Sequence, residues 1–221
     1  MQNNVITGAN AESILSTNKL IRNTYILLSI TLLFSAFTAA ISVLLRMPPS
    51  TYLFSIGGAF LLMWFVLPKT ANSTSGIGVV FLITGLLGFS LGPILNMYLA
   101  LPNGPQIVAT ALGGTGIIFL GLSGYALTTK KDFSFLGGFL FVGFLVVLGA
   151  AILNIFMTIP ALSLALSAAI VMLMSGFILF DTSRMINGGI DNYVLATIQL
   201  YMNIFNLFIS LLHLLGFSRS D

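Results

Sequence analysis

The sequence predicts an all-α, polytopic membrane protein whose seven transmembrane helices form a single domain. Charged residues make up 6% of the 221 residues and apolar residues make up 57%, whereas a soluble domain is about 25% charged. Residues 70–129, 133–180 and 192–218 contain no Asp, Glu, Lys or Arg. A helix needs about 20 apolar residues to cross the hydrocarbon core of a bilayer, so these stretches must hold several spans.

Helix-breaking residues divide the apolar stretches and set the ends of each expected span. The dividing signals, in chain order, are Pro48-Pro49, Pro68, Pro102 with Pro105, the charged loop Lys130-Lys131-Asp132, Pro160, and the turn Asn187-Gly188-Gly189. The expected spans are Asn23–Leu45, Ser50–Leu67, Gly76–Leu99, Gln106–Leu127, Phe135–Phe156, Ala161–Ile186 and Asn192–Phe217.

The cations are distributed unequally between the two ends of a seven-helix bundle. Six of the eight fall at the end that holds the N-terminus: Lys19, Arg22, Lys69, Lys130, Lys131 and Arg184. Arg46 and Arg219 fall at the other end. The positive-inside rule predicts a cytoplasmic N-terminus and an external, periplasmic C-terminus. The first 18 residues are polar and contain no cation, so they lack the features of a signal peptide, and we expect the first span to remain as an anchor. Residues 1–22 are expected to form a flexible cytoplasmic tail before the transmembrane domain, residues 23–221.

Composition and motif content exclude several functional classes. The eight cations are dispersed, so they form no basic patch for nucleic acid. The absence of Cys excludes disulfides and thiolate metal sites. The sequence contains no phosphate-binding or dinucleotide-binding glycine motif, and its single histidine cannot form a zinc site alone. We therefore expect no cofactor and no nucleic-acid partner for a chain that is surrounded by the lipid bilayer.

Ser123 and His213 suggest one enzymatic alternative, an intramembrane serine protease. Ser123 lies in a Gly-Leu-Ser-Gly sequence that is similar to the GxSG motif of rhomboid-type proteases. A Ser–His dyad needs the two side chains within hydrogen-bond reach. The expected topology places Ser123 near the cytoplasmic end of the fourth span and His213 near the external end of the seventh, roughly 20 Å apart in depth. We therefore expect a non-enzymatic protein, with His213 at an interface or a helix cap.

Several residues inside the spans are expected to pack helices together. Gly88 and Gly92 form a GxxxG motif that lets two helix backbones approach closely, within the bundle or in a homodimer. Pro93 follows and should kink the third span. Four amide side chains must find partners in the bundle interior, either as links between helices or along a polar path: Asn96, Asn154, Asn203 and Asn206.

Asp181 is the carboxylate that a loop or cap explains least well. It lies near the cytoplasmic end of the sixth span, and its candidate partners are Arg184 on the same helix and Lys69, Lys130 or Lys131 across the cytoplasmic face. Ionisable groups at membrane depth are costly and mark functional sites, but a structural ion pair is an equal alternative. Asp191, by contrast, precedes the seventh span and is expected to cap it.

The chain resembles the Bax-inhibitor-1 (transmembrane Bax inhibitor motif) family, and in particular its YccA-type branch of FtsH protease modulators, from about Leu15 to the end. The resemblance rests on the order of several short sequences: Leu15-Ser16-Thr17-Asn18-Lys19, Arg22-Asn23-Thr24-Tyr25, Gly92-Pro93-Ile94-Leu95-Asn96, Ala111-Leu112-Gly113-Gly114-Thr115, Lys131-Asp132-Phe133, Asn154-Ile155-Phe156, Asp181-Thr182-Ser183, Gly188-Gly189, Asn192-Tyr193, Leu200-Tyr201, Asn206-Leu207-Phe208 and Leu215-Gly216.

The resemblance implies a seven-helix fold in which the last helix is central. It also implies one of two activities. The first is a pH-sensitive calcium leak, gated by two buried aspartates on the sixth and seventh helices and a basic latch at the end of the second. Asp181 matches the first aspartate, and Lys69 stands in the latch region where an Arg is usual. Asn203 stands where the second aspartate is expected.

The amide at Asn203 weakens the leak-channel reading. Two close carboxylates share a proton and sense pH, whereas Asn203 can bond to Asp181 but cannot titrate, which leaves at most a weak calcium contact at Asp181. Lys69 also lacks the bidentate fork with which Arg clamps a carboxylate. The resemblance therefore favours the second activity, an inner-membrane protein that binds and inhibits an FtsH-type ATP-dependent protease in membrane-protein quality control. A cation or proton leak around Asp181 is the alternative.

Overall fold

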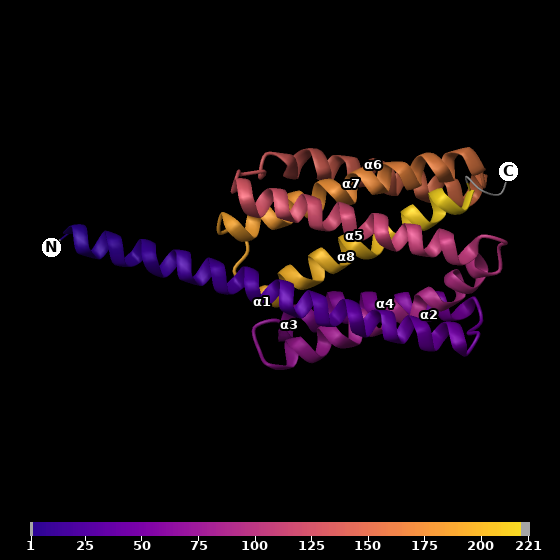
Figure 1. The fold of residues 1–221 in the computed structure, drawn as a ribbon, viewed down its shortest axis with the longest axis horizontal. Coiled ribbons are helices and arrows are strands. Elements are labelled where there is room, and N and C mark those ends of the chain that lie inside the picture. Colours follow the sequence, from indigo (N-terminus) through magenta and orange to yellow (C-terminus); the bar gives the residue numbers. More distant parts are fainter. Residues whose placement is uncertain (1, 218–221) are drawn as a thin grey trace.

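Residues 2–217 are described by the structure, which is a computed structural model. Its elements in chain order are α1 (Gln2–Leu44), α2 (Ser50–Leu61), the π-helical turn η1 (Leu62–Val66), α3 (Leu67–Thr70), α4 (Ser75–Leu99), α5 (Gly104–Thr129), α6 (Leu136–Met157), α7 (Pro160–Ile186) and α8 (Tyr193–Phe217). All these elements are helical, and Figure 1 shows them as one elongated bundle.

Within the described residues, seven helical segments are long and apolar enough to cross a membrane. They are Thr17–Leu44, Ser50–Thr70, Ser75–Leu99, Gly104–Thr129, Leu136–Met157, Pro160–Ile186 and Tyr193–Phe217. The seven predicted spans are therefore confirmed. Two of their fourteen boundaries differ from the prediction by three residues or more: the first span begins at Thr17 rather than Asn23, and the second ends at Thr70 rather than Leu67.

 All the other boundaries lie within two residues of their predicted positions.

The second span extends past Pro68 because the helix changes its winding there. A proline lacks the backbone N–H and its ring clashes with the carbonyl four residues earlier. The π-helical turn η1 widens the helix immediately before Pro68, which accommodates the ring and lets the helix continue through Lys69 to Thr70. Pro68 therefore does not end the span.

The first span continues toward the N-terminus without a break. The structure places the expected tail, from Gln2 onward, in the same helix as the span, and the sequence contains no proline there. Figure 1 shows this first part of α1 projecting from the end of the bundle at which α3 and the connection between α7 and α8 also lie. The flexibility and the cytoplasmic position of residues 1–22 stay predictions, and Met1 lies outside the described residues.

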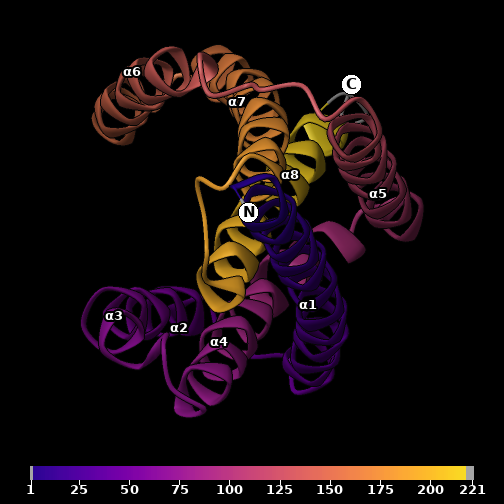
Figure 2. The same ribbon diagram turned by 90° about the vertical axis from the view of Figure 1, so that its left-hand side faces the viewer.

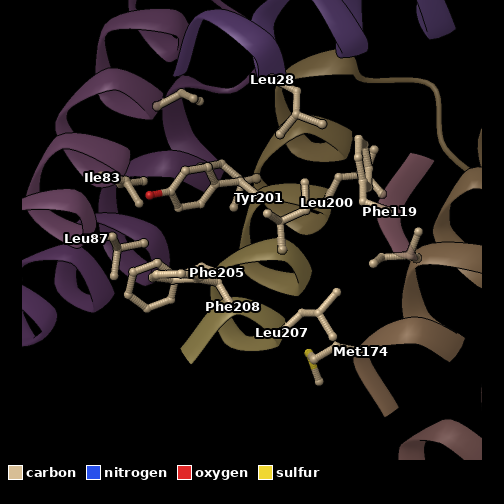
Figure 3. Close-up of a cluster of buried hydrophobic side chains, with 14 of the residues drawn as sticks. Leu28, Ile83, Leu87, Phe119, Met174, Leu200, Tyr201, Phe205, Leu207 and Phe208 are labelled. Atoms are coloured by element: carbon tan, nitrogen blue, oxygen red, sulfur yellow. The ribbon is translucent and has the colours of Figure 1, made fainter. Parts of the chain in front are cut away.

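α8 is the central helix, as the resemblance implied. It contacts α1, α4, α5 and α7, and Figure 2 shows these four helices around it. Tyr201 is 1% exposed and Leu207 is 0% exposed. Figure 3 shows Tyr201 and Phe205 of α8 pointing toward α4, while Leu207 points toward Met174 of α7. The core of the protein is therefore built around α8, and α6 lies at the periphery, packed on α7.

The GxxxG motif packs α4 against α1 within the bundle. A Cβ atom at Gly88 would meet the backbone oxygen of Ser35, and one at Gly92 would meet the side chain of Ser42. Pro93 lies inside α4, one residue after this contact. Asn96 adds a hydrogen bond between the two helices, because its Nδ2 donates to the Val43 oxygen at 3.3 Å. The two glycines are therefore needed for close packing inside one chain.

The six cations assigned to one end lie on elements of that end. Lys69 is at the end of α3, Lys130 and Lys131 follow α5, and Arg184 is in the last turn of α7. Arg46 follows α1 at the opposite end of the bundle, with φ at 50°. Arg219 lies outside the described residues. The separation of charge along the bundle axis is thus visible in the fold, whereas which end faces the cytoplasm stays a prediction.

Candidate functional site

A buried carboxylate and a buried amide meet between α7 and α8. The Asn203 Nδ2 donates a hydrogen bond to the Asp181 Oδ2 at 2.8 Å. Asp181 is 6% exposed and Asn203 is 7% exposed. Because α7 ends at Ile186, Asp181 lies about 7.5 Å along the helix axis from its end. Sequence reasoning named both residues, and the structure brings them together.

Hydroxyl groups link the neighbouring turn of α7 to two further helices. The Thr182 Oγ1 lies 3.4 Å from the Tyr25 hydroxyl of α1 and 3.5 Å from the Ser123 Oγ of α5. Thr182 is 0% exposed. Through Thr182, the turn of α7 that carries Asp181 therefore also contacts α1 and α5.

Ser183 fastens the loop between α5 and α6 to the same end of α7. Its hydroxyl donates to the Lys131 oxygen at 3.1 Å and accepts from the Phe133 backbone N–H at 2.9 Å. In that loop, hydrogen bonds from the side chain and the backbone N–H of Ser134 lower the pKa of the Asp132 carboxyl below its ordinary value. The charged loop Lys130-Lys131-Asp132 is therefore an ordered part of the surroundings of Asp181.

Two of the four cations proposed as partners of Asp181, Arg184 and Lys69, have other surroundings. The Arg184 Nη2 donates to the Gly189 oxygen at 2.9 Å, and its guanidinium carbon lies 5.4 Å from the centre of the Phe180 ring. Lys69 is exposed at the end of α3. The Asn203 amide is the side chain that donates a hydrogen bond to the Asp181 carboxylate. Among the side chains that the structure describes, those of residues 17–217, no group of three or more His, Cys, Asp or Glu could hold a metal ion.

Ser123 and His213 are directed to different partners. Ser123 contacts Thr182 near the end of α7, whereas the His213 Nδ1 lies 2.8 Å from the Ser167 Oγ near the beginning of α7. The two contacts lie at opposite ends of one helix, so the side chains do not form a dyad. His213 links α8 to α7 and is not a helix cap.

Asn192, rather than Asp191, caps the last helix, which corrects the sequence-based expectation. The Asn192 Oδ1 accepts hydrogen bonds from the backbone N–H groups of Val194 at 2.8 Å and Leu195 at 3.2 Å. Its Nδ2 also donates to the Asn72 Oδ1 at 2.6 Å. Asp191 is exposed. Both residue types favour caps, so the sequence alone could not choose between these neighbours.

The remaining amides and one tyrosine have distinct roles. Asn154 joins α6 to α7 through a 2.7 Å bond from its Nδ2 to the Ser163 Oγ. Asn206 does not link helices, since its Nδ2 donates to the Met202 oxygen of its own helix at 2.8 Å.

Tyr201 was not named as a site residue, yet its buried hydroxyl bonds to the Ser35 Oγ and donates to the Thr84 oxygen at 3.3 Å. Its ring gave no sequence signal that differs from ordinary core packing.

Comparison with known proteins decides the family. The family described as "Inhibitor of apoptosis-promoting Bax1" matches residues 17–220. The chain belongs to the Bax-inhibitor-1 family. In this family member, the buried aspartate at position 181 faces an asparagine at position 203.

Relatives of this Bax-inhibitor-1 protein occur in several bacteria. The chain is 50% identical over 209 residues to the Escherichia coli K12 protein named "Modulator of FtsH protease YccA", covering 95% of this chain and 94% of the relative. A protein of Escherichia coli O6:H1 with the same identity and coverage is named "Inner membrane protein YccA". An uncharacterised membrane protein of Vibrio cholerae is 49% identical over 210 residues, with coverage of 95% and 94%.

Proposed function

We propose that this chain binds an FtsH-type ATP-dependent protease in the inner membrane and slows its degradation of membrane proteins. The observation that carries the proposal is the 50% identity, over 95% of this chain, to the Escherichia coli protein named as a modulator of the FtsH protease. The match extends over 209 residues and therefore includes nearly all of the transmembrane domain. The chain acts by binding and is not itself an enzyme.

The projecting part of α1 supports this proposal. It lies at the end of the bundle that carries Lys69, Lys130, Lys131 and Arg184, and the positive-inside rule places that end in the cytoplasm. A segment that extends away from the membrane domain is accessible to a protease that acts on membrane proteins from the cytoplasmic side. Residues 2–18 are therefore the handle by which we expect the protease to engage the chain.

Two measurements on the full chain test the proposal. Affinity purification from detergent-solubilised inner membranes should recover the FtsH-type protease, and removal of residues 2–18 should lengthen the half-life of the chain in cells. Replacement of the same residues by a Gly/Ser sequence of equal length is the matched control for tail length, and it should also lengthen the half-life. Absence of the protease from the purified material would contradict the proposal, and unchanged half-lives would exclude the handle.

A leak of calcium or protons around Asp181 is the second candidate function. The observation in its favour is a carboxylate that is 6% exposed inside the transmembrane bundle, because such groups commonly mark ion pathways. The direct bond from Asn203 weighs against it. The amide occupies one carboxylate oxygen and adds no negative charge, so the site attracts a divalent cation less than a pair of aspartates would.

A further inference from the structure

A cavity of about 430 Å³ lies between the four helices α1, α4, α5 and α8. The backbones of α1 and α5 do not contact each other within the described chain, and Figure 2 shows them as separate helices on the same side of α8. Ala36 and Ala40 of α1 and Leu112 of α5 line the cavity and are exposed. The cavity therefore opens sideways between α1 and α5, toward the acyl chains of the bilayer.

The cavity follows the half of the bundle that ends near Arg46. Along α5 it is lined from Val108, one turn after the helix begins at Gly104, to Phe119. The helix rises about 16.5 Å between these two residues. One leaflet of the hydrocarbon core is about 15 Å thick, half of the whole core. The cavity thus has the length that one acyl chain spans in its own leaflet.

Two aromatic rings lie at the inner end of the cavity. The ring centres of Tyr25 on α1 and Phe119 on α5 are 6.1 Å apart, so side chains join the two helices here although their backbones are separate. The Tyr25 hydroxyl lies 3.4 Å from the Thr182 Oγ1, in the turn of α7 that carries Asp181. The two rings therefore lie between the cavity and the buried pair of Asp181 and Asn203.

The polar side chains that line the cavity are already bonded within the protein. They are those of Ser35, Thr115 and Tyr201. The Thr115 Oγ1 donates to the Ala111 oxygen at 2.7 Å, while the Tyr201 hydroxyl bonds to the Ser35 Oγ and donates to the Thr84 oxygen. An apolar cavity does not hold water, and an empty one would lose the dispersion contacts of its walls. This lining favours an occupant made of methylene groups.

We infer that the acyl chain of a membrane phospholipid enters between α1 and α5 and fills this cavity. A transmembrane helix of a partner is too wide. The volume of about 430 Å³ over the length of about 16.5 Å gives a mean cross-section of about 26 Å², whereas a helix about 10 Å across needs about 80 Å². Phospholipid chains surround the mouth of the cavity, so they rather than free fatty acids supply the occupant.

A photoreactive phospholipid, with a diazirine near the end of one acyl chain, tests the inference on the full chain in liposomes. Leu91 and Phe205 line the cavity and are 8% and 7% exposed, so lipid outside the bundle does not reach them. After irradiation, mass spectrometry should find adducts at these two residues. Adducts confined to outward-facing residues, such as Leu33 and Leu120, which are 73% and 68% exposed, would overturn the inference.

A matched pair of glycine substitutions in α5 gives the second readout. Gly116 lines the cavity, and nothing lies within 4 Å of a Cβ atom built on it. The side chain of Gly116→Leu should therefore occupy the cavity and reduce the adducts at Leu91 and Phe205 to background. Gly113→Leu is the control, because Gly113 also has no atom within 4 Å of its Cβ position but does not line the cavity. This control should keep the wild-type adducts.

Ala40→Leu narrows the same mouth from α1 and should also reduce the inner adducts, which provides a variant in a second helix if Gly116→Leu does not fold. Wild-type labelling of Leu91 and Phe205 in folded Gly116→Leu would overturn the cavity as the binding site. A photoreactive fatty acid, added in a separate sample, should label the two residues less than the phospholipid does. Labelling by the fatty acid alone would overturn the choice of a phospholipid.

Discussion

The Asn203 Nδ2 donates a 2.8 Å hydrogen bond to the Asp181 Oδ2 between the central helix α8 and its neighbour α7. Both side chains are less than a tenth exposed, so neither exchanges freely with water. The bond satisfies one carboxylate oxygen with a group that cannot titrate. It thereby joins two helices at a depth where an unpaired carboxylate would be costly.

Removal of the amide should therefore destabilise the bundle. Asn203→Leu leaves the Asp181 carboxylate without this donor, and hydrogen bonds to charged groups contribute about 1.5–3 kcal/mol. Thermal unfolding in detergent should show a clear decrease in midpoint. Asn206→Leu is the matched control, since Asn206 bonds only within its own helix. Equal midpoints for Asn203→Leu and the wild type would show that the bond contributes little.

A second carboxylate at position 203 should change ion permeation. In proteoliposomes the wild-type chain should pass little calcium, with weak dependence on pH. Asn203→Asp places two carboxylates together, and such a pair shares a proton, so its charge changes with pH. Flux through this variant should rise and become pH-dependent, and Asp181→Ala should abolish the increase. Steep gating of the wild type between about pH 6 and 8 would contradict this account of Asn203.

Close packing between α1 and α4 should depend on Gly88. In Gly88→Ala the new Cβ would meet the backbone oxygen of Ser35, and a backbone atom cannot turn aside as a side chain can. We expect a loss of about 1–3 kcal/mol, the usual cost of overpacking. Gly78→Ala in the same helix is the control, because nothing lies within 4 Å of its Cβ position. Equal unfolding midpoints for the two variants would contradict the close packing of α1 and α4 at Gly88.

The cap of α8 should be sensitive to Asn192 and insensitive to Asp191. Asn192→Ala removes the acceptor for two backbone N–H groups, and the loss of such a cap costs about 0.5–2 kcal/mol. Asp191→Ala changes an exposed residue and should leave the unfolding midpoint in place. A larger effect for Asp191→Ala would show that Asp191, the residue that the sequence favoured, caps α8.

The sequence predicted the seven spans because proline, glycine and charge mark their ends. It could not predict that the helix would pass Pro68, since this depends on the π-helical turn before it. The meeting of Asp181 and Asn203 was foreseen through the family resemblance. By contrast, the positions of Lys69 and Arg184 depend on how helix ends pack.

The rate at which a reconstituted FtsH-type protease degrades a membrane-protein substrate tests the central claim most directly. The protease, the substrate and this chain should be placed together in liposomes, with ATP supplied outside and the remaining substrate measured over time. We predict that degradation slows as the ratio of this chain to protease rises. An unchanged degradation rate in the presence of the folded wild-type chain would contradict the proposed function.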